Sequence, residues 1–262
     1  MHEQAFPFRR YHWADEPLPI PERPGSQKPA ILRTAEEQFA RTKLLRYAPV
    51  PKQRMFHRGG CKSRERLLMA GNQVGKTTAA GAETAMHLTG RYPHWWDGRR
   101  FEGPVRGWVG SIGFTSTRDG AQRVLLGEPK RRESWGTGMI PGDDILDWSL
   151  RGGLPDVLDS MLVRHVSGGV STLGFKSYEQ GREKWQGETL DFVWFDEEPP
   201  LDIYIEGLTR TNATGGLAYI TLTPLKGMTP LLQLFMDCPG FNNPDYWDEE
   251  SLREMAKAES KG

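Results

Sequence analysis

Cysteine is scarce in this sequence, and long apolar runs are missing. The 262 residues include two cysteines, Cys61 and Cys238, which lie far apart. So few cysteines argue against a disulfide framework and favour a protein of a reducing, intracellular compartment. No apolar run approaches the length of a membrane span, and the N-terminus shows no signal-peptide pattern. We therefore expect an intracellular protein without a membrane span.

An excess of positive charge is also missing. The chain has 34 lysines and arginines against 34 aspartates and glutamates, so its formal net charge is zero. Many nucleic-acid-binding proteins are basic overall. Any DNA contact must therefore come from local patches, from other chains or from another domain. A hydrophobic content of 37% is sufficient for a core, and the length allows one large α/β domain with or without appendages.

The most informative segment is Arg66–Thr78, with the sequence RLLMAGNQVGKTT. Leu67–Met69 predicts a buried strand, and Thr77–Leu88 predicts a helix rich in small and apolar residues. The loop between them matches the phosphate-binding pattern G-x-x-x-x-G-K-[ST], except that Ala70 occupies the first glycine position. The alternative is a glycine-rich turn with an exposed lysine, but the strand–loop–helix context favours a nucleotide site.

Each part of this loop has a predicted role in binding a nucleoside triphosphate. Backbone N–H groups of such a loop point at phosphate oxygens, and the N-terminus of the following helix favours anions. Lys76 is predicted to reach the β- and γ-phosphates, and the Thr77 hydroxyl to hold Mg²⁺. The loop residues predicted to bind ATP are Gly71, Asn72, Gln73, Val74, Gly75, Lys76, Thr77 and Thr78.

A second nucleotide motif lies at Leu190–Glu198, LDFVWFDEE. Its apolar run predicts a strand whose end brings carboxylates to the edge of the sheet where ligands bind in α/β proteins. Asp196 is predicted to hold Mg²⁺, directly or through water, and Glu197 to polarise a water for attack on the γ-phosphate. The alternative is a solvated acidic turn, which the presence of Lys76 earlier in the chain disfavours. Glu198 is predicted to be a surface or supporting residue.

Two segments are candidates for contacts to the base and the γ-phosphate. Tyr47 and Gln53 lie just before the loop strand, where an aromatic ring and an amide can stack on and hydrogen-bond adenine. The alternative is a helix-entry turn with an exposed glutamine. Thr221 and Thr223 end a predicted strand, and their hydroxyls can sense the γ-phosphate. The alternative there is ordinary β-branched strand residues.

Two arginines near the acidic motif, Arg182 and Arg210, are candidate catalytic residues. An arginine supplied to a transition-state phosphate accelerates hydrolysis by about 10³–10⁵-fold. The alternative for each is a salt-bridged surface residue.

Strands alternating with helices predict an α/β fold with a mostly parallel central sheet flanked by helices. Predicted helices cover Thr34–Tyr47, Thr77–Leu88, Thr117–Leu126, Pro230–Met236 and Asp248–Ala258, and predicted strands cover Leu67–Met69, Val105–Gly110, Leu190–Phe195 and Leu217–Leu222. Met161–Val166 and Ser171–Phe175 predict a hairpin. We expect an extended proline-rich arm over residues 1–33, a nucleotide-binding domain over 34–240 and the start of a linker segment over 241–262.

With these motifs the chain resembles the ATPase part of large terminase subunits, the DNA-packaging motors of tailed bacteriophages, especially those of the headful-packaging kind. The resembling runs are Tyr47–Arg54, Met69–Thr78, His87–Pro93, Tyr178–Gly187, Val193–Pro200, Glu206–Asn212 and Thr221–Met228. The nucleotide motifs are shared by many ATPases. The runs that begin at Tyr178 and Glu206 are more specific.

This resemblance implies a P-loop NTPase fold of the ASCE, RecA-like type. It implies Lys76 and Thr77 as Walker A residues, Asp196 and Glu197 as the Walker B aspartate and catalytic glutamate, and Thr221–Thr223 as a coupling motif. It further implies ATP and Mg²⁺ as ligands and double-stranded DNA as the translocated substrate. The implied partners are a portal protein, a small terminase subunit and other copies of the chain in a homo-oligomeric ring. The implied location is the cytoplasm of the infected bacterial host.

Two departures from the family qualify this expectation. Some terminases have an arginine inside the phosphate loop, where this chain has Asn72, so the catalytic arginine must come from elsewhere in the chain or from a neighbour. We expect that the chain lacks the C-terminal nuclease domain of the family and is an isolated motor domain that is monomeric by itself. Two alternatives stay open: the first RecA-like domain of a DEAD-like helicase, and a nucleotide-gated binding module that hydrolyses ATP slowly or not at all.

Overall fold

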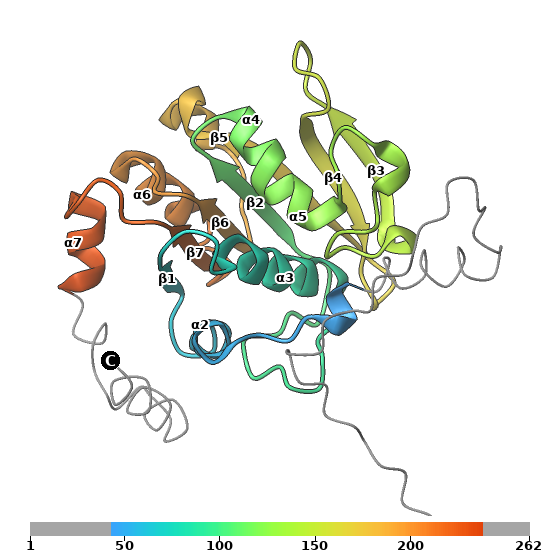
Figure 1. The fold of residues 1–262 in the computed structure, drawn as a ribbon, viewed down its shortest axis with the longest axis horizontal. Helices are drawn as coiled ribbons and strands as arrows, with labels where there is room; N and C mark the ends of the chain where they lie inside the picture. Colours follow the sequence, from blue (N-terminus) through green and yellow to red (C-terminus); the bar gives the residue numbers. More distant parts are fainter. Residues whose placement is uncertain (1–42, 238–262) are drawn as a thin grey trace, which may run out of the picture. The chain divides into compact units, whose positions relative to one another are not determined.

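The computed structural model describes residues 43–237 (Figure 1). Its strands are β1 (Glu65–Met69), β2 (Arg106–Ser111), β3 (Ile145–Leu150), β4 (Leu158–Arg164), β5 (Val170–Ser177), β6 (Phe192–Asp196) and β7 (Leu217–Leu222). Its α-helices are α2 (Pro51–Gly59), α3 (Lys76–Thr89), α4 (Phe114–Thr117), α5 (Arg123–Leu126), α6 (Leu201–Arg210) and α7 (Pro230–Met236). The predicted arm, most of the predicted helix Thr34–Tyr47, the helix Asp248–Ala258 and the linker segment lie outside the described residues.

The described strands form a single sheet in the order β1-β7-β6-β2-β5-β4-β3. The five strands from β1 to β5 in this order are parallel, and β4 is antiparallel to both β5 and β3. The predicted mostly parallel sheet and the predicted hairpin are therefore confirmed. Strand β7 lies between β1, which precedes the phosphate loop, and β6, which ends at the acidic motif. The predicted α/β fold class with a mostly parallel central sheet is therefore confirmed.

Three of the described strands and α-helices were not predicted: α2, β3 and α6. Strand β3 has the apolar residues Leu146, Trp148 and Leu150 in alternation with polar ones, which is a strand signal, but it lies at the sheet edge and these side chains are about 40% exposed. Helix α6 follows Pro200 and packs on β6 and β7. Strand β3 and helix α6 were detectable in the sequence only as short segments of mixed polarity.

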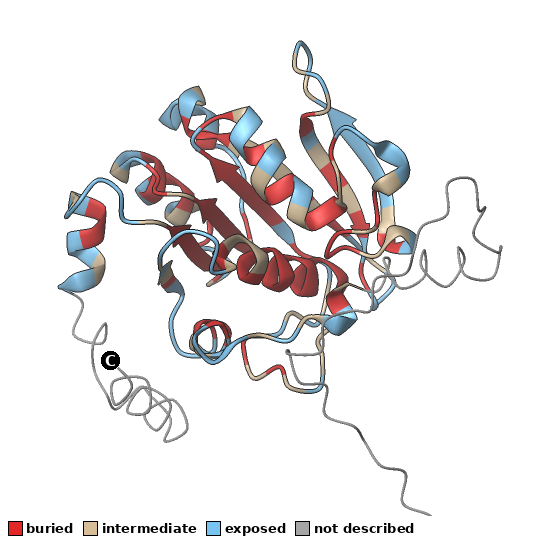
Figure 2. Cartoon of the chain, viewed as in Figure 1, coloured by how far each residue is buried: buried red, intermediate tan, exposed pale blue. Residues whose placement is uncertain are grey.

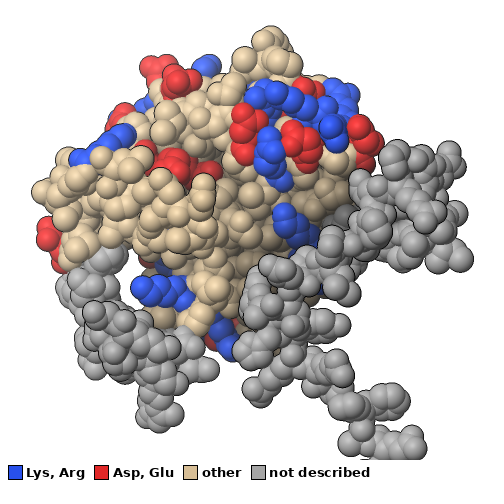
Figure 3. Space-filling model, viewed as in Figure 1, with Lys and Arg blue, Asp and Glu red and all other residues tan. Residues whose placement is uncertain are grey.

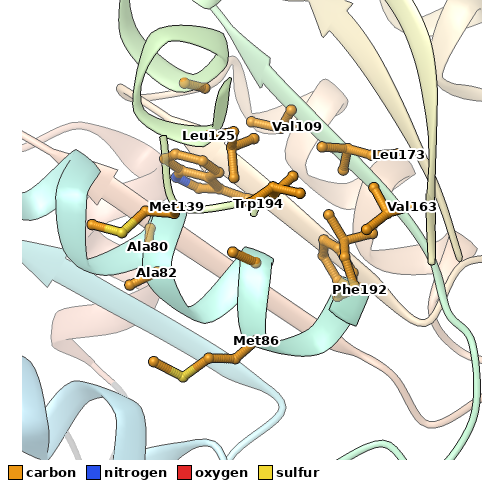
Figure 4. Close-up of a cluster of buried hydrophobic side chains, with 14 of the residues drawn as sticks. Ala80, Ala82, Met86, Val109, Leu125, Met139, Val163, Leu173, Phe192 and Trp194 are labelled. Carbon is orange, nitrogen blue, oxygen red and sulfur yellow. The ribbon is translucent and has the colours of Figure 1, made fainter. Parts of the chain in front are cut away.

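Helices cover both faces of the sheet, because alternate residues of the central strands point to opposite sides. Phe192 and Trp194 pack with residues of α3 and α5 in one hydrophobic cluster, part of which is shown in Figure 4. Val193 and Phe195 pack with residues of α6 and α7 in a second cluster. Buried residues accordingly concentrate in the central strands and in α3 (Figure 2).

Small side chains allow α3 to lie close to its neighbours. All of its residues from Ala79 to Thr89 are buried. A Cβ atom at Gly81 would come within 2.4 Å of Val124, at the start of α5, so glycine is required there by the close approach of the two helices. This packing holds the first turn of α3, which starts at Lys76, against the sheet.

The predicted helix Thr117–Leu126 is confirmed with an irregularity in its middle. It begins earlier, at Phe114, and a π turn over Arg118–Gln122 separates α4 from α5. Single π turns inside α-helices occur frequently at functional sites. No helix within residues 43–237 has the length and apolar character that crossing a membrane requires.

Candidate nucleotide-binding site

The phosphate loop connects β1 to α3, as predicted. Gln73 and Gly75 have positive φ values of 61° and 83°. The positive φ requires glycine at Gly75, and a Cβ atom there would in addition lie 2.9 Å from the terminal amide nitrogen of Gln53. Ala70 has no positive φ, so alanine fits the first position of the motif without strain. The departure from the glycine pattern at that position is therefore conformationally harmless.

Lys76 is buried and lies over the loop. Its ammonium donates hydrogen bonds to the Gly71 carbonyl oxygen at 2.5 Å and to Thr223 Oγ1 at 3.0 Å. The Thr223 hydroxyl in turn donates to Asn72 Oδ1 at 2.9 Å. The structure thus brings the predicted residues Lys76 and Thr223 together, and it links the end of β7 to both sides of the phosphate loop.

Asp196 ends β6 opposite the first turn of α3. Its Oδ1 atom accepts hydrogen bonds from Thr77 at 3.1 Å and from Thr221 at 2.9 Å. Thr221 accepts one from the Trp194 indole at 2.9 Å. Burial raises the pKa of Asp196 to about 6, although the two threonine hydroxyls and Lys76 act in the opposite direction. The two predicted metal ligands, Thr77 and Asp196, are therefore adjacent.

Glu197 has a strained backbone. Its φ is 69°, in the left-handed region that side chains with a Cβ atom rarely adopt. Its N–H donates to the Thr221 carbonyl oxygen at 2.7 Å, and its own carbonyl accepts from the Tyr178 hydroxyl at 2.9 Å. Within residues 43–237 no hydrogen bond to its carboxylate is found, and the side chain is half-buried. Strain of this kind persists where the surroundings hold the backbone in place, and it clusters at active sites.

Glu198 contacts a different element, the start of α7. It is buried, and its carboxylate accepts a hydrogen bond from the Thr229 hydroxyl at 2.5 Å. Thr229 is the N-cap of α7, where its oxygen accepts from the Leu232 N–H. Glu198 therefore anchors the start of α7, and the supporting role predicted for it fits better than a surface position.

Tyr178 is a residue to which the sequence alone assigned no role. It is buried, and its hydroxyl lies 3.1 Å from the carbonyl oxygen of Gly110, 3.2 Å from that of Asp196 and 2.9 Å from that of Glu197. It thereby joins the carboxyl ends of β2 and β6. Burial raises its pKa well above the usual value, and the charges of Asp196 and Glu197 add to this. Its only sequence signal was its place in the specific run Tyr178–Gly187.

Gln53 contacts the phosphate loop directly. It lies in α2, and its amide nitrogen donates to the carbonyl oxygens of Gly75 at 3.2 Å and Val74 at 3.4 Å. Its amide oxygen accepts from the Val50 N–H at 3.1 Å and from the Tyr47 hydroxyl at 3.3 Å. Tyr47 and Gln53 therefore form one unit beside the loop, which is where a contact to adenine was predicted.

The two predicted arginines meet at a shared carboxylate away from these groups. Arg182 pairs with Glu206 at 2.9 Å, and Arg210 pairs with the same buried carboxylate at 3.0 Å. In the described part of the chain neither arginine forms an ion pair with Asp196 or Glu197. The salt-bridged alternative therefore describes their contacts in this structure. On the face of the molecule shown in Figure 3, basic and acidic side chains are mixed, as the balanced charge predicts.

Comparison with known proteins places the chain in a family. The family described as "Terminase large subunit, T4likevirus-type, N-terminal" matches residues 67–255, and the chain belongs to it. The large terminase subunit of Salmonella phage P22 is 42% identical over 222 residues, which cover 78% of this chain and 44% of that protein. The chain thus spans less than half the length of this relative.

Solved structures of large terminases are also similar over part of their length. The large terminase of bacteriophage HK97 matches 71% of this chain and 37% of its own, with a TM-score of 0.44 and 11% identity. The large terminase of a thermophilic bacteriophage, solved in complex with ATP-gamma-S, matches 71% and 37%, with a TM-score of 0.40 and 13% identity.

Proposed function

We propose that this chain is the ATP-hydrolysing motor domain of a large terminase subunit and that it drives double-stranded viral DNA into a procapsid. The observation that supports this most directly is the convergence of Lys76, Thr77, Asp196 and Glu197. Lys76 and Thr77 follow β1, and Asp196 and Glu197 lie at the end of β6. Lys76 contacts Thr223 just after β7, and Thr77 contacts Asp196, so the residues lie at one edge of the sheet. Membership of the terminase family favours DNA packaging over the helicase alternative.

ATP binding is explained by the loop and by Lys76. The Lys76 ammonium now contacts neutral oxygens of Gly71 and Thr223. Charged phosphate oxygens are stronger acceptors than these, so a triphosphate in the loop attracts the ammonium away from them. The Thr223 hydroxyl, which contacts both Lys76 and Asn72, then changes partners when the γ-phosphate is present. This exchange makes Thr223 suited to report the state of the nucleotide to β7.

The residues beside Asp196 fit Mg²⁺. Mg²⁺ prefers oxygen ligands and usually retains several waters, so one carboxylate and one hydroxyl suffice in addition to phosphate oxygens. Asp196 and Thr77 supply these oxygens. Oδ1 of Asp196 accepts from both threonines, and we find no hydrogen bond to Oδ2 within residues 43–237. When bound, the ion would neutralise charge on the β- and γ-phosphates. A nearby divalent charge would also keep Asp196 ionised despite its burial.

Glu197 is the proposed general base. Its side chain is free of protein partners in the described residues and follows directly after Asp196, so it can orient and polarise a water for in-line attack. The backbone hydrogen bonds from Tyr178 and to Thr221 hold it in a conformation that it would otherwise avoid. A module that only binds nucleotide has no need for such a group.

The proposed partners follow from the family and from the exposure of Arg182. We propose a homo-oligomeric ring on the portal protein, with a small terminase subunit that recognises double-stranded DNA. Asn72 supplies no positive charge in the loop, so an arginine must come from elsewhere. The Arg182 side chain is 57% exposed against 24% for Arg210, so Arg182 is the arginine we propose to act on the triphosphate of a neighbouring subunit.

The experiment compares Glu197→Gln with Glu198→Gln in the same assays. We expect Glu197→Gln to bind ATP like the unmodified protein and to lose at least about 10²-fold in steady-state hydrolysis. Glu198→Gln should retain hydrolysis, because its carboxylate contacts Thr229. If only the Glu198 variant loses hydrolysis, the assignment of the base is wrong. Packaging of DNA into procapsids by the full-length protein, with and without Glu197→Gln, tests the motor function itself.

A further inference from the structure

Gly120 occupies an unusual place, in the middle of the helix that runs from Phe114 to Leu126. A glycine inside a helix is less favourable than alanine by about 0.5–1 kcal/mol, so its presence there calls for a reason. It lies in the π turn over Arg118–Gln122. A Cβ atom at this position would lie 2.9 Å from Asp196 Oδ2, and apart from its chain neighbours and the backbone of its own helix no other atom of the described residues lies within 4 Å of it.

The other glycines inside described helices differ in what surrounds them. A Cβ atom at Gly81 would meet Val124, and one at Gly207 would meet Phe195, so those two glycines serve the packing of the core. At Gly120 the neighbouring atom is a carboxylate oxygen of the acidic motif. It is also the oxygen that the two threonines leave unused, because Thr77 and Thr221 both contact Oδ1.

We propose that Gly120 is a positioning residue for the Asp196 carboxylate. The π turn brings the backbone of this helix up to Oδ2, and the missing side chain leaves that oxygen the room to accept from metal-bound water. A methyl group there would either push Oδ2 aside or exclude the water. The inference rests on the proposed function, because it concerns the same Mg²⁺-dependent site.

The first test is the Mg²⁺ dependence of the Gly120→Ala variant. We expect the Mg²⁺ concentration for half-maximal hydrolysis to rise, or kcat to fall, by about tenfold or more. Nucleotide binding measured in the presence of a chelator should stay unchanged. Ser116→Ala, an exposed position of the same helix, is the matched control and should behave like the unmodified protein. A Gly120→Ala variant in which both the Mg²⁺ dependence and kcat are unchanged would overturn the inference.

A second test needs no activity and separates positioning from a general effect on folding. In an Asp196→Ala background the nearby oxygen is gone, so Gly120→Ala should raise Tm, as alanine usually does in a helix. In the unmodified background the same substitution should raise Tm less or lower it. Equal Tm shifts in the two backgrounds would refute the contact. If the unmodified protein itself shows no Mg²⁺-dependent nucleotide hydrolysis, the proposed function fails, whatever Gly120→Ala does to Tm.

Discussion

Replacing Glu197 by glycine should abolish hydrolysis and stabilise the fold at the same time. The residue has a φ of 69°, and a left-handed conformation costs a residue with a Cβ atom about 1–2 kcal/mol. Glycine has no such penalty. However, a chain with glycine loses more conformational entropy on folding, which lowers the free energy of unfolding by about 0.5–1 kcal/mol. Both backbone hydrogen bonds of Glu197 remain in the variant, and its carboxylate makes none in the described part of the chain. The net gain should therefore lie between about 0 and 1.5 kcal/mol.

The comparison that isolates the backbone is Glu197→Gly against Glu197→Gln. Glutamine retains the Cβ atom and therefore the strain, so it should unfold at nearly the same temperature as the unmodified protein. For a domain of this size, 1 kcal/mol corresponds to a shift of about 2–4 °C in Tm. We therefore expect Glu197→Gly to melt higher than Glu197→Gln by up to about 6 °C, with both variants inactive. Thermal melts and urea titrations in the absence of nucleotide measure the difference.

A matched control is Glu188→Gly. Glu188 is exposed and has no positive φ, so glycine there should leave the stability unchanged or lower it by up to about 1 kcal/mol. The reasoning is refuted if Glu197→Gly is less stable than Glu197→Gln. That result would mean that the Glu197 backbone is not strained in solution. The hydrogen bond from Tyr178 would then not be needed to hold that backbone in place.

Two further predictions concern the groups around Glu197. Burial raises the pKa of Asp196 from 3.8 to about 6, so the folded protein binds this proton more tightly than the unfolded chain does. The contribution of Asp196 to the free energy of unfolding should therefore fall by about 3 kcal/mol as the pH rises from about 4 to 6, and then level off. Urea unfolding of Asp196→Asn and of the unmodified protein across this range should show the two diverging; a constant difference would contradict the shift. Tyr178→Phe should lower kcat by about tenfold with unchanged ATP affinity, because the Glu197 carbonyl loses its donor. Weaker ATP binding at an unchanged kcat would show that Tyr178 serves the loop instead.

The motifs that the sequence alone determined are contiguous. The strand, loop and helix start of Arg66–Thr78 are neighbours in the chain, and so are the strand and acids of Leu190–Glu198. Their chemistry depends on residue types at fixed short spacings, and local patterning also predicted most of the parallel strands and the hairpin. For this reason Lys76, Thr77 and Asp196 could be named from the sequence, and the fold brings them together.

The tertiary structure decided the contacts between distant segments. The order of the sheet places β7 between the two motifs, which brings Thr223 to Lys76 and Thr221 to Asp196. Packing also pairs Arg182 with Glu206. No local spacing encodes these contacts, because each depends on which strands become neighbours and on how closely a helix approaches the sheet.

Tyr178 and Gly120 illustrate the same limit. A tyrosine in a turn and a glycine in a helix have no chemistry of their own that marks a nucleotide site. They gain a role only because folding places one hydroxyl against the carbonyl of Glu197 and one missing side chain against the carboxylate of Asp196. The sequence by itself thus indicated which groups we propose to bind and cleave a nucleotide. The packed fold determined which residues hold those groups in position, since such support depends on distances between segments far apart in the chain.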